Sequence, residues 1–154
     1  MIAVIQRVGK TSLTADGAPF SEISHGFLIL LGVLFGDEET DAKLLADKIA
    51  KLRVFADENG KMNRALSDVG GEVMVVSNFT LAANYRHGNR PDFLRAAPPK
   101  EADRLYRLFI DFISDAGIPA VSGVFGADMQ ITTTAEGPVT IVMDSAVLRK
   151  EPRQ

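Results

Sequence analysis

The chain has 154 residues, of which 46% are hydrophobic and none is cysteine. This length and composition suit one domain with a single core, and the lack of cysteine excludes disulfides, thiol nucleophiles and cysteine-ligated metals. The net charge of −3 argues against extensive binding to the phosphates of an RNA backbone. The longest apolar run, residues 27–35, is far shorter than the roughly 20 residues needed to cross a bilayer. Because the start resembles no signal peptide, we expect a cytoplasmic protein without membrane association.

The first third of the chain predicts strands and one helix. Short strands are expected over residues 2–8, 11–15, 19–23 and 27–34. Asp16-Gly17 predicts the tight turn between the second and third of these strands. Thr40 is a suitable N-cap for a helix over about residues 41–53, whose apolar side chains fall on one face.

The rest of the chain adds one helix and three strands. Pro99 suits the first turn of a helix that runs to about Ala116 and stops at Gly117. Strands are expected over residues 73–80, 127–134 and 138–143. Together these elements predict an α+β fold, in which a curved, barrel-like, mostly antiparallel β-sheet packs against two helices. Residues 1–143 are expected to form the domain, and residues 144–154 a C-terminal tail.

The most informative motif is Gly137-Pro138-Val139, which we interpret as a hairpin tip between the last two strands. Glycine has no Cβ, and an X-Pro bond is the only peptide bond for which the cis form is cheap. Such a tip can direct main-chain carbonyls at a ligand and select it by shape. An ordinary surface turn is the alternative interpretation.

A second motif, Ser77-Asn78-Phe79-Thr80, follows the buried strand predicted from residue 73. Together with residues 2–8 at the start and 127–130 before the Gly-Pro motif, both motifs make the sequence resemble the D-aminoacyl-tRNA deacylase family (D-tyrosyl-tRNA deacylases) from Met1 to about Met143. The resemblance also implies the barrel-like fold. The chain departs from the family pattern at two positions. Asn78 stands where glutamine is usual, and Ala135 stands where asparagine is usual.

The resemblance implies a hydrolase that removes D-amino acids from mischarged tRNA, with catalytic residues Phe79, Thr80 and Ser77. The backbone N–H groups of Phe79 and Thr80 would form an oxyanion hole. The Thr80 hydroxyl would act either as nucleophile or by orienting substrate or water, and the lack of a neighbouring base favours orientation. Ser77 would fix the loop, or merely satisfy the end of the strand.

The resemblance also assigns substrate binding and chirality to Gly137, Pro138, Asn78, Arg7 and Met129. In the family the Gly-cis-Pro pair reaches into the site of the partner subunit and excludes L-residues by collision. Arg7 would support this pair. The implied assembly is a homodimer with shared active sites, and because glycine has no side chain to exclude, glycyl-tRNA is an implied second substrate.

The residues themselves offer little other catalytic equipment. Neither His25 nor His87 lies in a nucleophile motif, and no metal-ligand spacing is present, so we expect neither a triad, a metal nor a cofactor. The expected partner is the aminoacylated 3′ end of tRNA, with phosphate contacts from the local cluster of Arg86, His87, Arg90, Arg95 and Lys100. Two alternatives stay open, which are a deacylase of altered specificity and a non-catalytic RNA-binding module.

Overall fold

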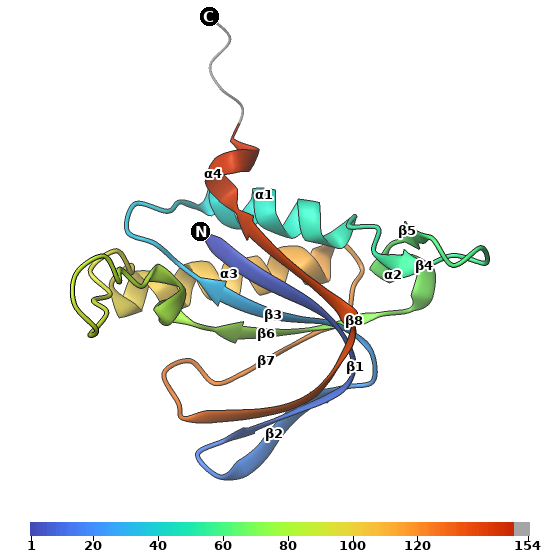
Figure 1. The fold of residues 1–154 in the computed structure, drawn as a ribbon, viewed down its shortest axis with the longest axis horizontal. Coiled ribbons are helices and arrows are strands. Elements are labelled where there is room, and N and C mark those ends of the chain that lie inside the picture. The colour runs from blue at the N-terminus through green and yellow to red at the C-terminus, as the bar shows by residue number, and fades with distance from the viewer. Residues whose placement is uncertain (150–154) are drawn as a thin grey trace, which may run out of the picture.

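Six strands form one strongly curved sheet, and two long helices pack against it (Figure 1). The structure, a computed structural model, describes residues 1–149. The strands of this sheet are β1 (Ile2–Ala15), β2 (Ala18–Ile23), β3 (Gly26–Gly32), β6 (Glu72–Ser77), β7 (Ala120–Ser122) and β8 (Met129–Asp144). The other elements are helices α1 (Glu39–Ala50), α2 (Leu66–Val69), α3 (Pro99–Asp115) and α4 (Ser145–Leu148), the 3-10 turn η1 (Phe79–Ala82), and the small hairpin of β4 (Phe55–Ala56) and β5 (Met62–Arg64).

The sheet is mixed, which corrects the expectation of a mostly antiparallel one. β1 pairs antiparallel with β2, β3 and β8, whereas β3 pairs in parallel with β6 and β6 with β7. The reason lies in the connections. The segments from β3 to β6 and from β6 to β7 contain α1 and α3, and crossovers of this length join parallel strands.

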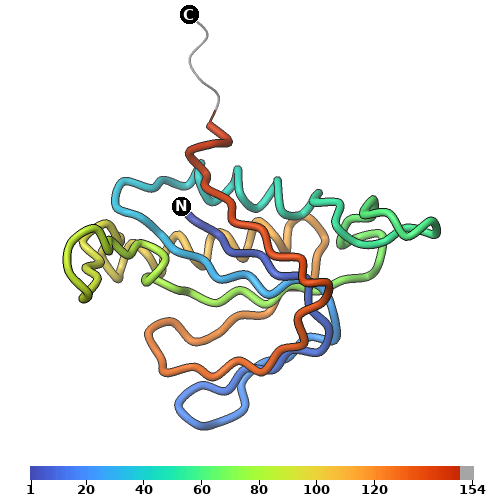
Figure 2. The backbone as a smooth tube through the Cα atoms, viewed as in Figure 1, coloured from blue at the N-terminus to red at the C-terminus, as the bar shows by residue number. Residues whose placement is uncertain are grey.

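The sheet curls until β2 approaches β7, which gives the predicted barrel-like shape (Figure 2). The Ser21 hydroxyl donates a hydrogen bond of 2.9 Å to the Ser122 carbonyl across this junction. Side chains of β3 and β6 alternate between two cores, because these strands are covered on both faces. Phe27 and Val73 pack toward the helices, while Leu28 and Met74 point into the barrel.

The two predicted helices are confirmed, with small shifts at their ends. α3 begins at Pro99 as expected, and Gly117 follows it with a φ of +83°. α1 begins at Glu39, two residues early, because the N-cap is Glu38 and not Thr40. The buried Asp41 carboxylate accepts a hydrogen bond of 2.8 Å from the Glu38 N–H. No helix within residues 1–149 is long and apolar enough to span a membrane.

The two longest strands, β1 and β8, are each continuous, whereas the sequence predicts a pair of shorter strands in place of each. Gly137-Pro138 therefore lies within β8 and not at a hairpin tip, so that prediction is wrong. Ala135 pairs with Val8 and Thr140 with Gln6, so the residues between them on β8 face Arg7 alone. Because β1 and β8 stay paired on both sides, the extra residues are absorbed as a bulge.

The two ends of the described chain meet beside α1. The Met1 ammonium contacts Asp37 Oδ1 at 2.7 Å and the Ser145 hydroxyl at 2.9 Å. Arg149 donates to the buried Asp41 carboxylate, with 2.9 Å from Nε to Oδ1. The start of the predicted tail is thus helical and packed, and residues 150–154 lie outside the described part of the chain.

Candidate functional site

The Ser77–Thr80 motif lies where β6 ends, as predicted, although the strand stops at Ser77 and a 3-10 turn replaces its last residues. The Asn78 N–H donates to the Leu31 carbonyl at 2.9 Å, which keeps the motif beside β3. Gly32 permits the turn to approach, since a Cβ there would lie 2.9 Å from Leu81 Cβ. The motif is therefore anchored to the edge of a rigid sheet.

The Asn78 side chain organises this turn. Its Oδ1 accepts a hydrogen bond of 3.2 Å from the Thr80 N–H and a second one from the Thr80 hydroxyl. Phe79 is the first residue of the turn, and its N–H has no acceptor within the turn for that reason. The family resemblance implies that the N–H groups of Phe79 and Thr80 form an oxyanion hole, and of these two donors only the Thr80 N–H is engaged by Asn78.

A cavity of about 830 Å³ opens beside the motif. It brings together four predicted site residues, Ser77, Asn78, Phe79 and Met129. The other lining residues are Val33, Phe35, Phe93, Leu94, Ala96, Ala97, Pro98, Pro99, Ala102, Phe125, Gly126 and Ala127. Thr80 follows in the chain directly after this wall. The cavity is mostly apolar, with its polar groups concentrated at the end of β6.

None of the residues that line this cavity has a titratable side chain. The His25 ring instead contacts the Val69 carbonyl through Nε2 at 2.9 Å, and His87 is exposed in the loop after η1. Within residues 1–149, no group of three or more His, Asp or Glu side chains is placed to hold a metal ion. The described chain therefore supplies this cavity with hydroxyl, amide and backbone groups but with no side-chain acid or base.

Several aromatic residues of the cavity have no signal in the sequence. Phe93 packs edge-on against Phe79, with ring centroids 5.1 Å apart. Phe35 and Leu94 are 77% and 87% exposed, and both line the cavity mouth. Phe125 reaches the cavity from the segment before β8. These residues come from three loops with no recognisable motif, so only the folded chain identifies them.

Gly137 and Pro138 lie away from this cavity. Their peptide bond is cis, as predicted, and both residues are exposed. The bulge faces Arg7, which pairs with Phe27 of β3, and Phe27 in turn pairs with Val73 at the start of β6. Ser77 is four residues further along β6, or about 13 Å, and three strand spacings of about 4.8 Å also intervene. One chain therefore does not bring the two motifs together.

Arg7 packs directly against the bulge. Its Nη1 donates to the Val54 carbonyl at 2.6 Å, and a Cβ built on Gly137 would lie 3.2 Å from its Nη2. The buried Nε has no hydrogen-bond partner among the described residues. Arg7 thus lies beside Gly137 and is hydrogen-bonded to the segment before β4.

Four members of the predicted basic cluster, Arg86, His87, Arg90 and Arg95, lie on the exposed loop between η1 and α3, and Lys100 lies in the first turn of α3. Asn84 and Asp92 close this loop through paired backbone hydrogen bonds of 2.8 and 3.0 Å and a side-chain bond of 2.8 Å. Arg86, His87 and Arg90 project from the enclosed segment into solvent. The same loop continues into Phe93 and Leu94, which line the cavity.

Comparisons with known proteins find similar sequences that span nearly the whole chain. The sequence profile described as D-Tyr-tRNA(Tyr) deacylase matches residues 4–144. A protein of Roseiflexus castenholzii named D-aminoacyl-tRNA deacylase is 53% identical over 153 residues, which are 99% of this chain and 97% of that protein. Another of the same name, from Thermodesulfovibrio yellowstonii, is 50% identical over 94% of this chain and 99% of that protein.

Solved structures show the same fold. One named c-Myc DNA Unwinding Element Binding Protein is 36% identical with a TM-score of 0.86, over 94% of this chain and 98% of the other. A second, described as a probable eukaryotic D-amino acid tRNA deacylase, is 14% identical with a TM-score of 0.79, over 92% and 97% of the two chains.

Proposed function

This chain belongs to the D-Tyr-tRNA(Tyr) deacylase family and hydrolyses the ester bond of D-aminoacyl-tRNA, and we propose that it does so without any side-chain acid or base of its own. The activity excludes the alternative of a non-catalytic RNA-binding module. The observation that carries the proposal is the absence of titratable side chains among the described residues that line the cavity.

An aminoacyl-tRNA ester suits such a site because it is already activated. The ribose of the terminal adenosine carries a second hydroxyl beside the ester oxygen, and this hydroxyl can activate water or relay a proton to the leaving oxygen. Water then adds to the carbonyl, and collapse of the tetrahedral intermediate releases the D-amino acid and the tRNA. The protein has only to bind, orient and stabilise the developing oxyanion.

In this proposal the Phe79 N–H is the principal oxyanion donor, since Asn78 already accepts from the Thr80 N–H. The Thr80 hydroxyl donates to Asn78, so its lone pairs remain available to orient water or substrate. That arrangement favours orientation over nucleophilic attack. Ser77 fixes the strand end, and Met129 forms part of the apolar wall against which the terminal adenosine rests.

Chirality is assigned to Gly137 and Pro138 of a second copy of the chain. The bulge is exposed and the cavity mouth is open, with Phe35, Phe79 and Leu94 presented to solvent. If both motifs serve one site, they must come from different copies, and a two-fold dimer would supply two equivalent shared sites. Arg7 would hold the bulge. A filter that acts by collision with a side chain would admit glycine, so glycyl-tRNA is a proposed second substrate.

The proposed contact with tRNA is confined to its aminoacylated 3′ end. The exposed cations of the loop between η1 and α3, among them Arg86 and Arg90, would bind the nearest phosphates, which reconciles the activity with a net charge of −3. We place the enzyme in the cytoplasm, where aminoacyl-tRNA is used, and assign it no cofactor.

The test compares hydrolysis of D-aminoacyl-tRNA, its L-counterpart and glycyl-tRNA, each with a terminal ribose or a 2′-deoxyribose. We expect rapid turnover of the D- and glycyl esters, none of the L-ester, and a loss of at least about 100-fold for the deoxy substrate if the ribose hydroxyl assists catalysis. Equal turnover of both riboses would overturn the mechanism, and turnover of the L-ester would indicate the altered specificity that Asn78 and Ala135 suggest.

A further inference from the structure

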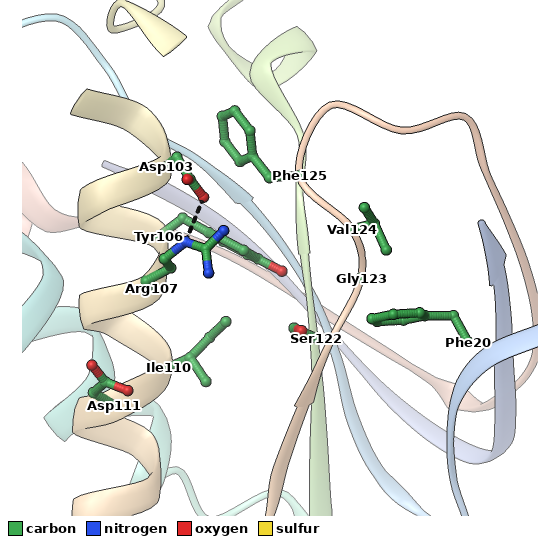
Figure 3. Close-up of a pocket in the computed structure, with 10 residues that line it drawn as sticks. All are labelled: Phe20, Asp103, Tyr106, Arg107, Ile110, Asp111, Ser122, Gly123, Val124 and Phe125. Atoms are coloured by element: carbon green, nitrogen blue, oxygen red, sulfur yellow. Dashed lines mark hydrogen bonds and ion pairs between the residues drawn. The ribbon is translucent and has the colours of Figure 1, made fainter. Parts of the chain in front are cut away.

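A second cavity, of about 610 Å³, lies between α3 and the segment that leads from β7 to β8 (Figure 3). Asp103, Arg107 and Asp111 are spaced by four residues and therefore share one face of α3. The opposite side is formed by Ser122 to Phe125, with Phe20 beyond it from β2. Tyr106 forms the back wall and is held by a hydrogen bond of 2.8 Å from its hydroxyl to the Val75 carbonyl.

This second cavity adjoins the first one. Phe125 lines both cavities, and Gly123 of the second is so close to Met129 of the first that a Cβ there would lie 2.6 Å from the Met129 sulfur. The wall between them is a single stretch of backbone with its side chains. Because the two cavities adjoin, a flexible ligand bound at the first one is within reach of the second.

The chemistry of the second cavity suits a planar base and not a phosphate. Phe20 is 54% exposed and Phe125 is half-buried, so both offer aromatic surface for stacking. Arg107 is the only cation among the lining residues, and two carboxylates accompany it. Its Nε donates to Asp103 Oδ1 at 3.0 Å, which leaves the outer nitrogens of the guanidinium pointing outward and Asp111 exposed.

We propose that this cavity binds the penultimate nucleotide of the tRNA 3′ end, a cytidine in every mature tRNA. The proposal rests on the function inferred above, because the terminal adenosine must occupy the first cavity. Single-stranded RNA is recognised by stacking on aromatic side chains and by hydrogen bonds to the base edge. A cytosine presents an N4 amino donor next to the N3 and O2 acceptors.

The ion pair of Asp103 and Arg107 on α3 complements that edge, because Arg107 Nε engages only Oδ1 of the Asp103 carboxylate. The Asp103 carboxylate accepts from N4, as carboxylates do with cytosine, while the outer nitrogens of Arg107 donate to N3 and O2. A uracil in the same pose would place its O4 acceptor against the carboxylate. The second cavity thus distinguishes a CCA end from other single-stranded ends. It also binds the RNA through a base and not through phosphate contacts.

The experiment compares D-aminoacyl-tRNA ending in CCA with the same tRNA ending in CUA. For the wild-type enzyme we expect kcat/KM to fall about tenfold on the CUA substrate. Asp103→Asn and Arg107→Met should bring this ratio close to one, and Phe20→Ala should weaken the binding of both substrates. Arg64→Met removes an exposed cation that lines neither cavity, and should keep the wild-type ratio.

Two further measurements separate the outcomes. Titration of the dinucleotide CpA should shift the NMR resonances of Phe20 and Arg107, and UpA should do so more weakly. Hydrolysis of D-aminoacyl-adenosine, which lacks the cytidine, tests the first cavity by itself. If D-aminoacyl-adenosine and D-aminoacyl-tRNA are both hydrolysed while the wild-type enzyme shows no preference for the CCA end, the cytidine site is wrong and the deacylase function stands. The same conclusion follows if both are hydrolysed and the α3 variants keep that preference. If neither substrate is hydrolysed, the proposed function itself fails.

Discussion

The amide oxygen of Asn78 accepts two hydrogen bonds from Thr80, one from its backbone N–H at 3.2 Å and one from its hydroxyl. This relationship ties the proposed oxyanion turn to the proposed orienting hydroxyl. It also gives a role to Asn78, one of the two residues at which the chain departs from its family pattern. The amide of Asn78 is one methylene shorter than that of glutamine, and in this structure it serves the turn itself.

Two replacements of Asn78 should distinguish its structural role in the turn from the effect of charge on the deacylation rate. Asn78→Ala removes the cap, which should cost about 1 kcal/mol of stability and slow deacylation at least tenfold. Asn78→Asp keeps an acceptor for both Thr80 groups, so stability should be retained, but its negative charge beside the oxyanion should still lower the rate. Thermal unfolding and single-turnover rates distinguish these effects. An Asn78→Asp enzyme as fast as the wild type would place the oxyanion elsewhere.

Removal of the Thr80 hydroxyl tests its orienting role directly. Thr80→Val keeps the shape of the side chain and should slow the chemical step by about 10- to 100-fold, while Thr80→Ser should retain most of the rate. Sedimentation should show the same assembly state for all three proteins, because the change is local. If the Thr80→Val enzyme kept the wild-type rate, the Thr80 hydroxyl would have only the structural role of capping the turn.

Substitution of Gly137 should affect both stability and turnover. Its φ is +111°, and a Cβ there would lie 3.0 Å from the Val139 nitrogen. Gly137→Ala should therefore cost about 1–3 kcal/mol in unfolding experiments and reduce hydrolysis of D-aminoacyl-tRNA. Gly60→Ala is a suitable control, since Gly60 has a φ of +74° and no atom within 4 Å of an added Cβ. The control should lose some stability and no activity, and equal rates for the two variants would exclude the bulge from the site.

Activity should be insensitive to metal removal. Exhaustive dialysis against EDTA is expected to leave the rate of D-aminoacyl-tRNA hydrolysis within about twofold, because the proposed mechanism uses backbone and substrate groups only. Since Mg²⁺ also stabilises tRNA, the measurement should be repeated with D-aminoacyl-adenosine. Loss of activity on the small substrate, with recovery on adding back one metal, would contradict the mechanism.

The contact between Asp41 and Arg149 should govern acid stability. Burial is the largest influence and raises the pKa of Asp41, but hydrogen bonds from Arg149, the Glu38 N–H and Ser145 together lower it from 3.8 to about 2. A lowered folded-state pKa contributes stability above pH 4 that is lost as the pH falls toward 2. Arg149→Met should thus lower the free energy of unfolding by about 1 kcal/mol at pH 7, and the difference should shrink as the pH falls from 4 and disappear below pH 2. Arg64→Met, which removes an exposed ion pair, should show almost no difference at either pH.

Elements with local signals could be predicted from the amino-acid sequence. The buried stripe of α3, with Leu105, Phe109 and Ile113, follows the helical period, and Pro99 and Gly117 mark its ends. The apolar runs of β3 and β6 indicate strands covered on both faces. The position of Ser77-Asn78-Phe79-Thr80 at a strand end was also predictable, because the apolar pattern stops there.

Tertiary structure alone decided how these elements combine. Residues 2–15 and 129–144 form continuous bulged strands because each is held by partners distant in the sequence, and no local pattern records that pairing. Phe35, Phe93 and Phe125 meet only because the sheet curls and three loops converge at one end. The distance between Gly137 and Thr80 is also a property of the sheet, since it depends on which strands lie between them. Periodicity and capping act over a few residues and can be seen in the sequence, whereas cavities form from side chains that only long-range pairing brings together.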